Sequence, residues 1–192
     1  GCGAFELATG IRRQFAADEV TLTGMSVGDP RTDGLKTFQA ENNIEYISSR
    51  RSSLPLLVRE KREFDLIVSH LTLQHVVHPL RHIERLYGLL APGGELRCDL
   101  DLPILLSLVK GGNAAVNEKI IKDMFAQLQA KGIGVEATDE HIFLRKPLRG
   151  GEKLSLSAWY ELVPPTERDN LERNIVPFGP RIVMYKLHRP AS

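Results

Sequence analysis

The sequence lacks the features that mark several large classes of protein. Its only two cysteines, Cys2 and Cys98, are too few for a disulfide framework, so we expect both to be reduced thiols. Its apolar runs are far shorter than the roughly 20 residues that cross a bilayer, and no signal-peptide pattern is visible. We therefore expect a cytoplasmic protein with no membrane partner.

An excess of charge of one sign is also missing. The 192 residues include 25 Lys and Arg against 24 Asp and Glu, with a formal net charge of +1. This balance gives no overall attraction to nucleic acid, which makes such a partner unlikely. One basic run, between residues 50 and 62, could face RNA, but Glu60 and the nearby Glu63 are interleaved with it, as on a solvated helix face. The oligomeric state has no signal in the sequence.

The chain shows no repeat or low-complexity tract, and its length fits a single domain spanning residues 1–192. Apolar patterns of period 2 and 3.6 alternate along it, which predicts an α/β fold with a doubly wound, mostly parallel sheet. The expected strands are residues 20–26, 44–48, 64–69, 95–100, 134–138, 142–145, 154–163 and 181–187. The expected helices are residues 4–17, 33–43, 54–63, 79–90 and 115–131.

Three motifs follow one another in the first half of the chain. Gly1-Cys2-Gly3-Ala4-Phe5 is a glycine turn before a helix, where the missing Cβ lets the backbone approach a ligand. Phe64–Ser69 is an apolar strand that ends in a small polar residue, and Leu90–Leu96 reads Leu-Ala-Pro-Gly-Gly-Glu-Leu. In this order and at these intervals the motifs resemble those of class I S-adenosylmethionine-dependent methyltransferases, particularly the branch that acts on small molecules.

The resemblance runs from Gly1 to about Leu100. It implies a Rossmann-like methyltransferase fold with an antiparallel hairpin at one sheet edge, S-adenosylmethionine as cofactor, and methyl transfer to a small-molecule acceptor. In such open α/β sheets the ligand lies at the carboxyl ends of the strands. The cofactor-binding residues that it implies are Gly1, Cys2, Gly3, Phe5, Ser26, Ser48, Ser49, Ser69 and His70.

Two positions depart from the family pattern. The second strand of the family usually ends in Asp or Glu, which binds both ribose hydroxyls, but this chain has Ser26 there. A serine cannot form the charge-assisted pair, a loss of about 1–3 kcal/mol, and Asp29 is an alternative partner. Ser48 or Ser49 likewise stands where an acid commonly meets the adenine. These departures keep open a second interpretation, a catalytically silent relative that acts as a binding or interaction protein.

Four histidines gather after the strand Phe64–Ser69, namely His70, His75, His78 and His82. His75 matches the second histidine of the family's Leu-His-His-Val pattern. We predict that His70 or His75 is the general base toward a hydroxyl or amine acceptor, because imidazole titrates near neutral pH. The alternative is that these side chains cap the helix or bind loop backbone. Their spacing fits no usual zinc site, so we predict no metal.

The family places a first strand before the glycine turn, in the middle of the sheet, whereas this chain begins on the turn. Without it, the neighbouring strands would face each other across a gap of roughly 9–10 Å. We expect residues upstream of Gly1 to supply that first strand, which is missing here; the alternative is a different strand order. Residues 146–180 are expected to form an insertion near the substrate, where Trp159 and Tyr160 would line an acceptor pocket or pack in the core.

Two other functions fit less well. A dinucleotide fingerprint Gly-x-Gly-x-x-Gly would need glycine at position 6, which is Glu6. The Asn-Pro-Pro-Tyr type of motif found in amino-base methyltransferases is absent, since the strand at 64–69 is followed by His70 and Leu71. A small-molecule acceptor is therefore the prediction.

Overall fold

The computed structural model describes residues 6–26, 32–48, 53–69, 79–98, 114–138, 141–149, 154 and 181–187. The helices are α1 (Glu6–Arg12), α2 (Asp33–Glu41), α3 (Ser53–Arg59), α4 (Pro79–Gly88) and α6 (Ala114–Ala130). The strands are β1 (Val20–Ser26), β2 (Ile44–Ser48), β3 (Phe64–Ser69), β4 (Leu90–Cys98), β5 (Gly134–Ala137), β6 (Ile142–Arg145) and β7 (Arg181–Leu187). The predicted α/β fold is confirmed.

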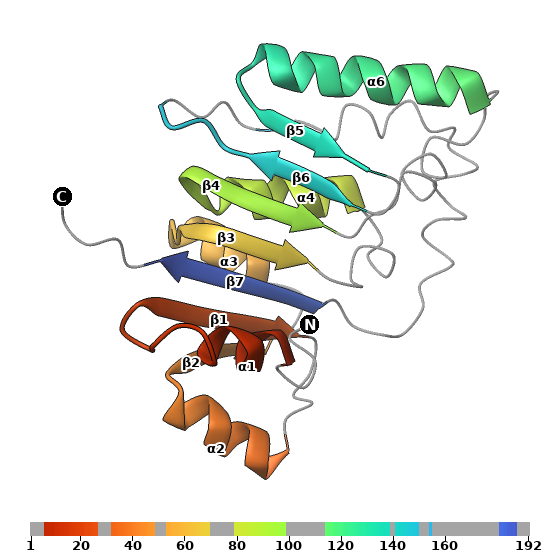
Figure 1. Cartoon of the computed structure of the whole chain (residues 1–192). Helices are drawn as coiled ribbons and strands as arrows, with labels where there is room; N and C mark the ends of the chain where they lie inside the picture. Colours follow the sequence, from red (N-terminus) through yellow and green to blue (C-terminus); the bar gives the residue numbers. More distant parts are fainter. Residues whose placement is uncertain are drawn as a thin grey trace.

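All seven strands form one mixed sheet in the order β2-β1-β7-β3-β4-β6-β5 (Figure 1). The ladders β1–β2 and β3–β4 are parallel, and the ladders that involve β6 or β7 are antiparallel. It follows that β1 to β5 all point the same way, while β6 and β7 point the opposite way. The hairpin of β5 and β6 forms one edge of the sheet.

The centre of the sheet differs from the expectation of a strand supplied from before Gly1. The C-terminal strand β7 lies between β1 and β3 and pairs antiparallel with both. Val183 stands opposite Gly24 on one side and opposite Val68 on the other. Because β7 satisfies the backbone groups of both neighbours, β1 and β3 do not face an open gap. In this structure β7 thus occupies the place in the sheet that was predicted for a strand from before Gly1.

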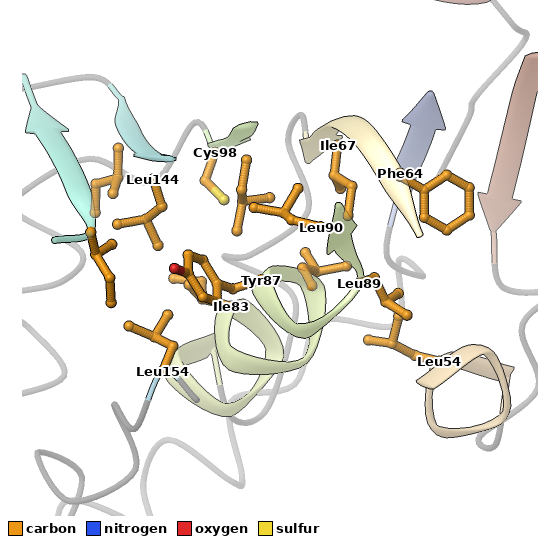
Figure 2. Close-up of a cluster of buried hydrophobic side chains, with 14 of the residues drawn as sticks. Leu54, Phe64, Ile67, Ile83, Tyr87, Leu89, Leu90, Cys98, Leu144 and Leu154 are labelled. Atoms are coloured by element: carbon orange, nitrogen blue, oxygen red, sulfur yellow. The ribbon is translucent and has the colours of Figure 1, made fainter. Parts of the chain in front are cut away.

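Hydrophobic clusters cover both faces of the sheet. On one face Ala8 of α1 packs with Val20 and Leu22 of β1 and with Ile44 of β2. On the other face the larger cluster joins α3, α4 and α6 to the strands, and Figure 2 shows Ile83 and Tyr87 of α4 in it. Figure 1 accordingly places α1 in front of the sheet and α3 and α4 behind it.

The Pro-Gly-Gly motif lies inside a strand rather than in a turn between a helix and a strand. α4 ends at Gly88, and β4 already pairs with β3 at Leu90, before the register shifts and resumes at Glu95. Gly93 has φ +77, and a Cβ on Gly94 would lie 2.9 Å from a backbone carbonyl oxygen of β3. The glycines thus let β4 bulge against β3, which explains why the strand begins earlier than predicted.

Two helices end four or five residues earlier than the sequence predicts. α1 spans seven residues and α3 ends at Arg59, after which Lys61 adopts a left-handed conformation with φ 54. The N-cap of α2 is Thr32, whose Oγ1 accepts a hydrogen bond from the Leu35 amide at 3.3 Å. No helix among the described residues combines the length and the hydropathy that a membrane span requires.

The expected insertion at 146–180 is only partly described. Residues 146–149 follow β6 and lie beside the bulge of β4, where the Gly93 amide donates to the Lys146 carbonyl at 3.1 Å. This contact is at the amino end of β4. Arg181, the residue that follows this segment, begins β7 and stands opposite Ser26 at the carboxyl end of β1. Trp159 and Tyr160 lie outside the described residues, so the substrate-facing insertion stays a prediction.

Candidate functional site

Small residues end the four parallel strands at one edge of the sheet. Ser26 of β1 stands opposite Ser48 of β2, and Ser69 of β3 stands opposite Cys98 of β4. In open α/β sheets, ligands bind at this end of the parallel strands. Three residues that the sequence predicts for cofactor binding, Ser26, Ser48 and Ser69, are therefore brought to the same edge.

Ser69 is a buried polar residue. Its side chain has an exposed fraction of 0%, and its Oγ has no hydrogen-bond partner among the described residues. Ile67, two residues earlier on the same face of β3, packs in the cluster that contains α4. Ser69 therefore faces the α4 side of the sheet, and its buried hydroxyl is of the kind that native proteins pair with a ligand, water or another polar group.

Chain topology places the first turn of α4 toward the same end of the sheet as Ser69. Because β3 and β4 are parallel neighbours, the chain must leave the carboxyl end of β3 and return along α4 to the amino end of β4. The first turn of α4 contains His82, which precedes the buried Leu86 by one helical turn on the same stripe. The side chain of His82 thus points from α4 toward the sheet, on the side of the carboxyl ends of the parallel strands.

Burial keeps His82 uncharged. Loss of solvent, together with the nearby positive charge of Arg85, lowers the pKa of His82 from 6.5 to about 4. Its Nε2 is buried and, like Ser69 Oγ, has no hydrogen-bond partner in the described part of the chain. The sequence placed His82 only among the four histidines after β3; the helical spacing to Leu86 is the signal that marks it as inward-facing.

A third buried polar group, the hydroxyl of Tyr87, lies further along α4. Tyr87 packs between α4 and β6 near Ile83 and Leu144 (Figure 2), and the Lys146 ammonium is 6.0 Å from its ring centroid. Burial raises the pKa of the Tyr87 hydroxyl, which has no partner within the described residues. Lys146 donates to the Leu90 carbonyl at 2.7 Å, so Tyr87 lies toward the amino end of β4, away from Ser69.

Charged side chains line a separate hollow of about 460 Å³ on the opposite face of β4, β5 and β6. There Glu95 accepts hydrogen bonds from Arg97 at 2.6 Å and from Arg145 at 2.9 Å. Burial raises the pKa of Glu95, but the bonds from Arg145 and Arg97 outweigh it and hold the pKa below its usual value. These charges satisfy one another. No group of three His, Cys, Asp or Glu residues in the described ranges could hold a metal.

The other predicted site residues lie outside the described residues. These are Gly1, Cys2, Gly3, Phe5, Ser49, His70 and His75. The glycine turn directly precedes α1, and His70 directly follows β3, so the chain connects both to elements of this edge. Their roles stay predictions.

The comparisons with known proteins decide the family. A family model described as "Methyltransferase domain" matches residues 1–98, just over half of the 192 residues. The chain belongs to this methyltransferase family. Members generally bind S-adenosylmethionine as the methyl donor. The search of curated proteins found no match.

The described residues of this methyltransferase fit such a cofactor at the carboxyl edge. The buried, unpartnered hydroxyl of Ser69 offers a hydrogen bond, and the neighbouring parallel strands end in the small residues Ser26, Ser48 and Cys98. The strand ends at Ser26 and Ser48 supply no carboxylate for the ribose or the adenine. Uncharged hydrogen bonds would therefore hold the nucleoside in place of ion-assisted ones.

Proposed function

We propose that this methyltransferase binds S-adenosylmethionine at the carboxyl edge of its sheet and methylates a small molecule. The observation that carries the proposal is the family match over residues 1–98, which ends with the strand β4 at Cys98. The net charge of +1 and the absence of an amino-base motif favour a small acceptor over nucleic acid.

S-adenosylmethionine would supply a methyl group already activated by its sulfonium, so the chain needs little covalent chemistry. Its residues bind and orient the two reactants and exclude water. Ser69 would hydrogen-bond the bound cofactor at the end of β3, while the glycine turn before α1 would hold its methionine side. His70 or His75 would accept the proton that a hydroxyl or amine acceptor releases.

The test has two stages. Calorimetric titration with S-adenosylhomocysteine should give saturable heat if the cofactor site is functional. Incubation with methyl-tritiated S-adenosylmethionine and a cell extract, followed by separation at low molecular mass, should then place the label in the small-molecule fraction. Label in RNA or protein would contradict a small acceptor, and binding without any transfer would favour the catalytically silent relative.

A substitution at the end of β1 tests the cofactor site more sharply. Ser26→Asp restores the carboxylate that the family usually has there, and we expect it to tighten S-adenosylhomocysteine binding by about 1–3 kcal/mol, or roughly 5- to 150-fold. Ser26→Ala is the matched control and should weaken binding only a few-fold. Equal affinities for Ser26→Asp and the wild type would show that the end of β1 does not meet the ribose.

A further inference from the structure

The hollow on β4, β5 and β6 has the size of a small-molecule site and lies apart from the candidate cofactor site. Its volume of about 460 Å³ falls within the roughly 300–1,000 Å³ that ligand pockets span. The residues that line it alternate along the strands with residues of the buried cluster, as Arg97 does with Leu96, so it opens on the face opposite α4. On β5, Gly134 stands opposite Arg145 without a side chain, which keeps the floor open there.

Glu95 holds two arginines in place at this hollow. Its Oε1 accepts a hydrogen bond from Nε of Arg97 at 2.6 Å, and its Oε2 accepts one from Nη2 of Arg145 at 2.9 Å. The side chain of Glu95 is 19% exposed, against 52% for Arg97 and 68% for Arg145. Glu95 is therefore the inner anchor, and the two guanidinium groups are the charges that a ligand can reach.

The two arginines keep donors and charge for a ligand. Each guanidinium carries several N–H groups, and Glu95 engages one nitrogen of each. Within the described residues neither arginine forms another hydrogen bond. One carboxylate also balances only one of the two positive charges, so the three groups together have a net charge of +1. Because guanidinium groups bind carboxylates through paired N–H donors, a carboxylate is the partner that they favour.

Phe143 and Glu136 determine which carboxylate fits. Phe143 of β6 stands opposite Arg97 on one side and opposite Glu136 of β5 on the other. Its half-buried ring offers an apolar surface beside the Arg97 guanidinium, whose central carbon is 5.8 Å from the ring centroid. Glu136 also lines the hollow and has no ion-pair partner in the described part of the chain. Its negative charge would repel a second negative charge on the ligand, which disfavours phosphates and dicarboxylates.

We propose that this hollow is a second ligand site, which binds a small monocarboxylate with an apolar body. The carboxylate lies against the N–H groups of Arg97 and Arg145 that Glu95 leaves unused, and the body packs on the ring of Phe143. The hollow is on the face of the sheet opposite Ser69, so the site is separate from the candidate cofactor site and does not depend on the proposed function.

NMR titration with 3-phenylpropionate and with its neutral amide tests this site. The two probes share an apolar ring and differ in the charge of the carboxylate. We expect the wild type to bind the acid at least about tenfold more tightly than the amide, with chemical-shift changes that centre on β4 and β6. Arg145→Gln removes one guanidinium and should reduce this ratio to about threefold or less. Both probes are measured on one preparation of each protein, so a partial loss of folded protein does not alter the ratio.

Arg149→Gln is the matched control, because Arg149 is an exposed arginine after β6 that does not line the hollow. It should leave the ratio at the wild-type value. Glu136→Gln tests the limit on ligand charge. The wild type should prefer 3-phenylpropionate to the dicarboxylate phenylsuccinate, and Glu136→Gln should narrow this preference. If it does not, the restriction to monocarboxylates is overturned.

The site itself is overturned by any of three results. These are no saturable binding of 3-phenylpropionate to the wild type, equal binding of the acid and the amide, and a ratio that Arg145→Gln leaves unchanged or that Arg149→Gln narrows equally. Arg145→Gln should also retain the wild-type affinity for S-adenosylhomocysteine. A loss of that affinity would make the hollow part of the cofactor site and would overturn a separate one.

Discussion

The burial of His82 predicts a specific loss of stability in mild acid. The folded protein keeps this imidazole neutral down to a pKa of about 4, whereas the unfolded chain protonates it below 6.5. Between these two values the unfolded state binds more protons, so the free energy of unfolding falls as the pH falls. With about 1.4 kcal/mol for each pKa unit, the full effect is about 3 kcal/mol, of which about 2 kcal/mol is lost between pH 7 and pH 5.

Urea denaturation of the wild type and of His82→Leu at pH 7 and pH 5 measures this term. We expect the wild type to lose about 2 kcal/mol more than the variant over this interval, because leucine binds no proton. At pH 7 the variant should be no less stable than the wild type, since an apolar side chain replaces an unpartnered polar one. Equal losses in the two proteins, or an NMR titration that places the pKa of His82 near 6.5, would refute its burial.

Two further substitutions test the sheet. Gly94→Ala should cost about 1–3 kcal/mol of unfolding free energy, because its Cβ would lie 2.9 Å from backbone oxygens that cannot move aside, whereas Gly88→Ala, with nothing within 4 Å, should cost none. Thermal melts of the two variants measure these costs, and equal costs for Gly94→Ala and Gly88→Ala would contradict the bulge. Val183→Pro should cost at least about 3 kcal/mol, since it disrupts pairing with both Gly24 and Val68. If Val183→Pro melts at the wild-type temperature, β7 does not lie between β1 and β3.

The sequence was sufficient for the local elements but not for their order in space. The bounds of β1, β2, β3, β6 and β7 agree with the predictions, because each is an apolar run bounded by polar or turn residues. The position of β7 between β1 and β3 depends on pairing between residues more than 100 positions apart, which no local pattern encodes. The end of α3 was predicted four residues too late, because the helix closes in a left-handed turn at Lys61, a residue type that does not signal such a turn.

The same distinction applies to the candidate site. That small residues end the strands can be read directly from Ser26, Ser48 and Ser69. The burial of His82 was missed, although its spacing of four residues from the buried Leu86 indicates the sheet side of α4. A histidine next to three others suggests a loop residue or a base, and the loss of its charge depends on how completely α4 packs against the sheet.

The strand order also sets the spacing between the two pairs of strand ends at the candidate cofactor site. Ser26 and Ser48 belong to β1 and β2, whereas Ser69 and Cys98 belong to β3 and β4, and within the described residues β7 is the strand that joins these pairs. The spacing between the two halves is therefore set by a strand at residues 181–187. A change in β7 should alter ligand affinity and stability together, even though it is more than 80 residues from Cys98 in the chain. The bulge at Gly94 lies toward the amino end of β4, away from the candidate cofactor site. Gly94→Ala should therefore reduce stability and leave the ligand affinity of the folded protein unchanged.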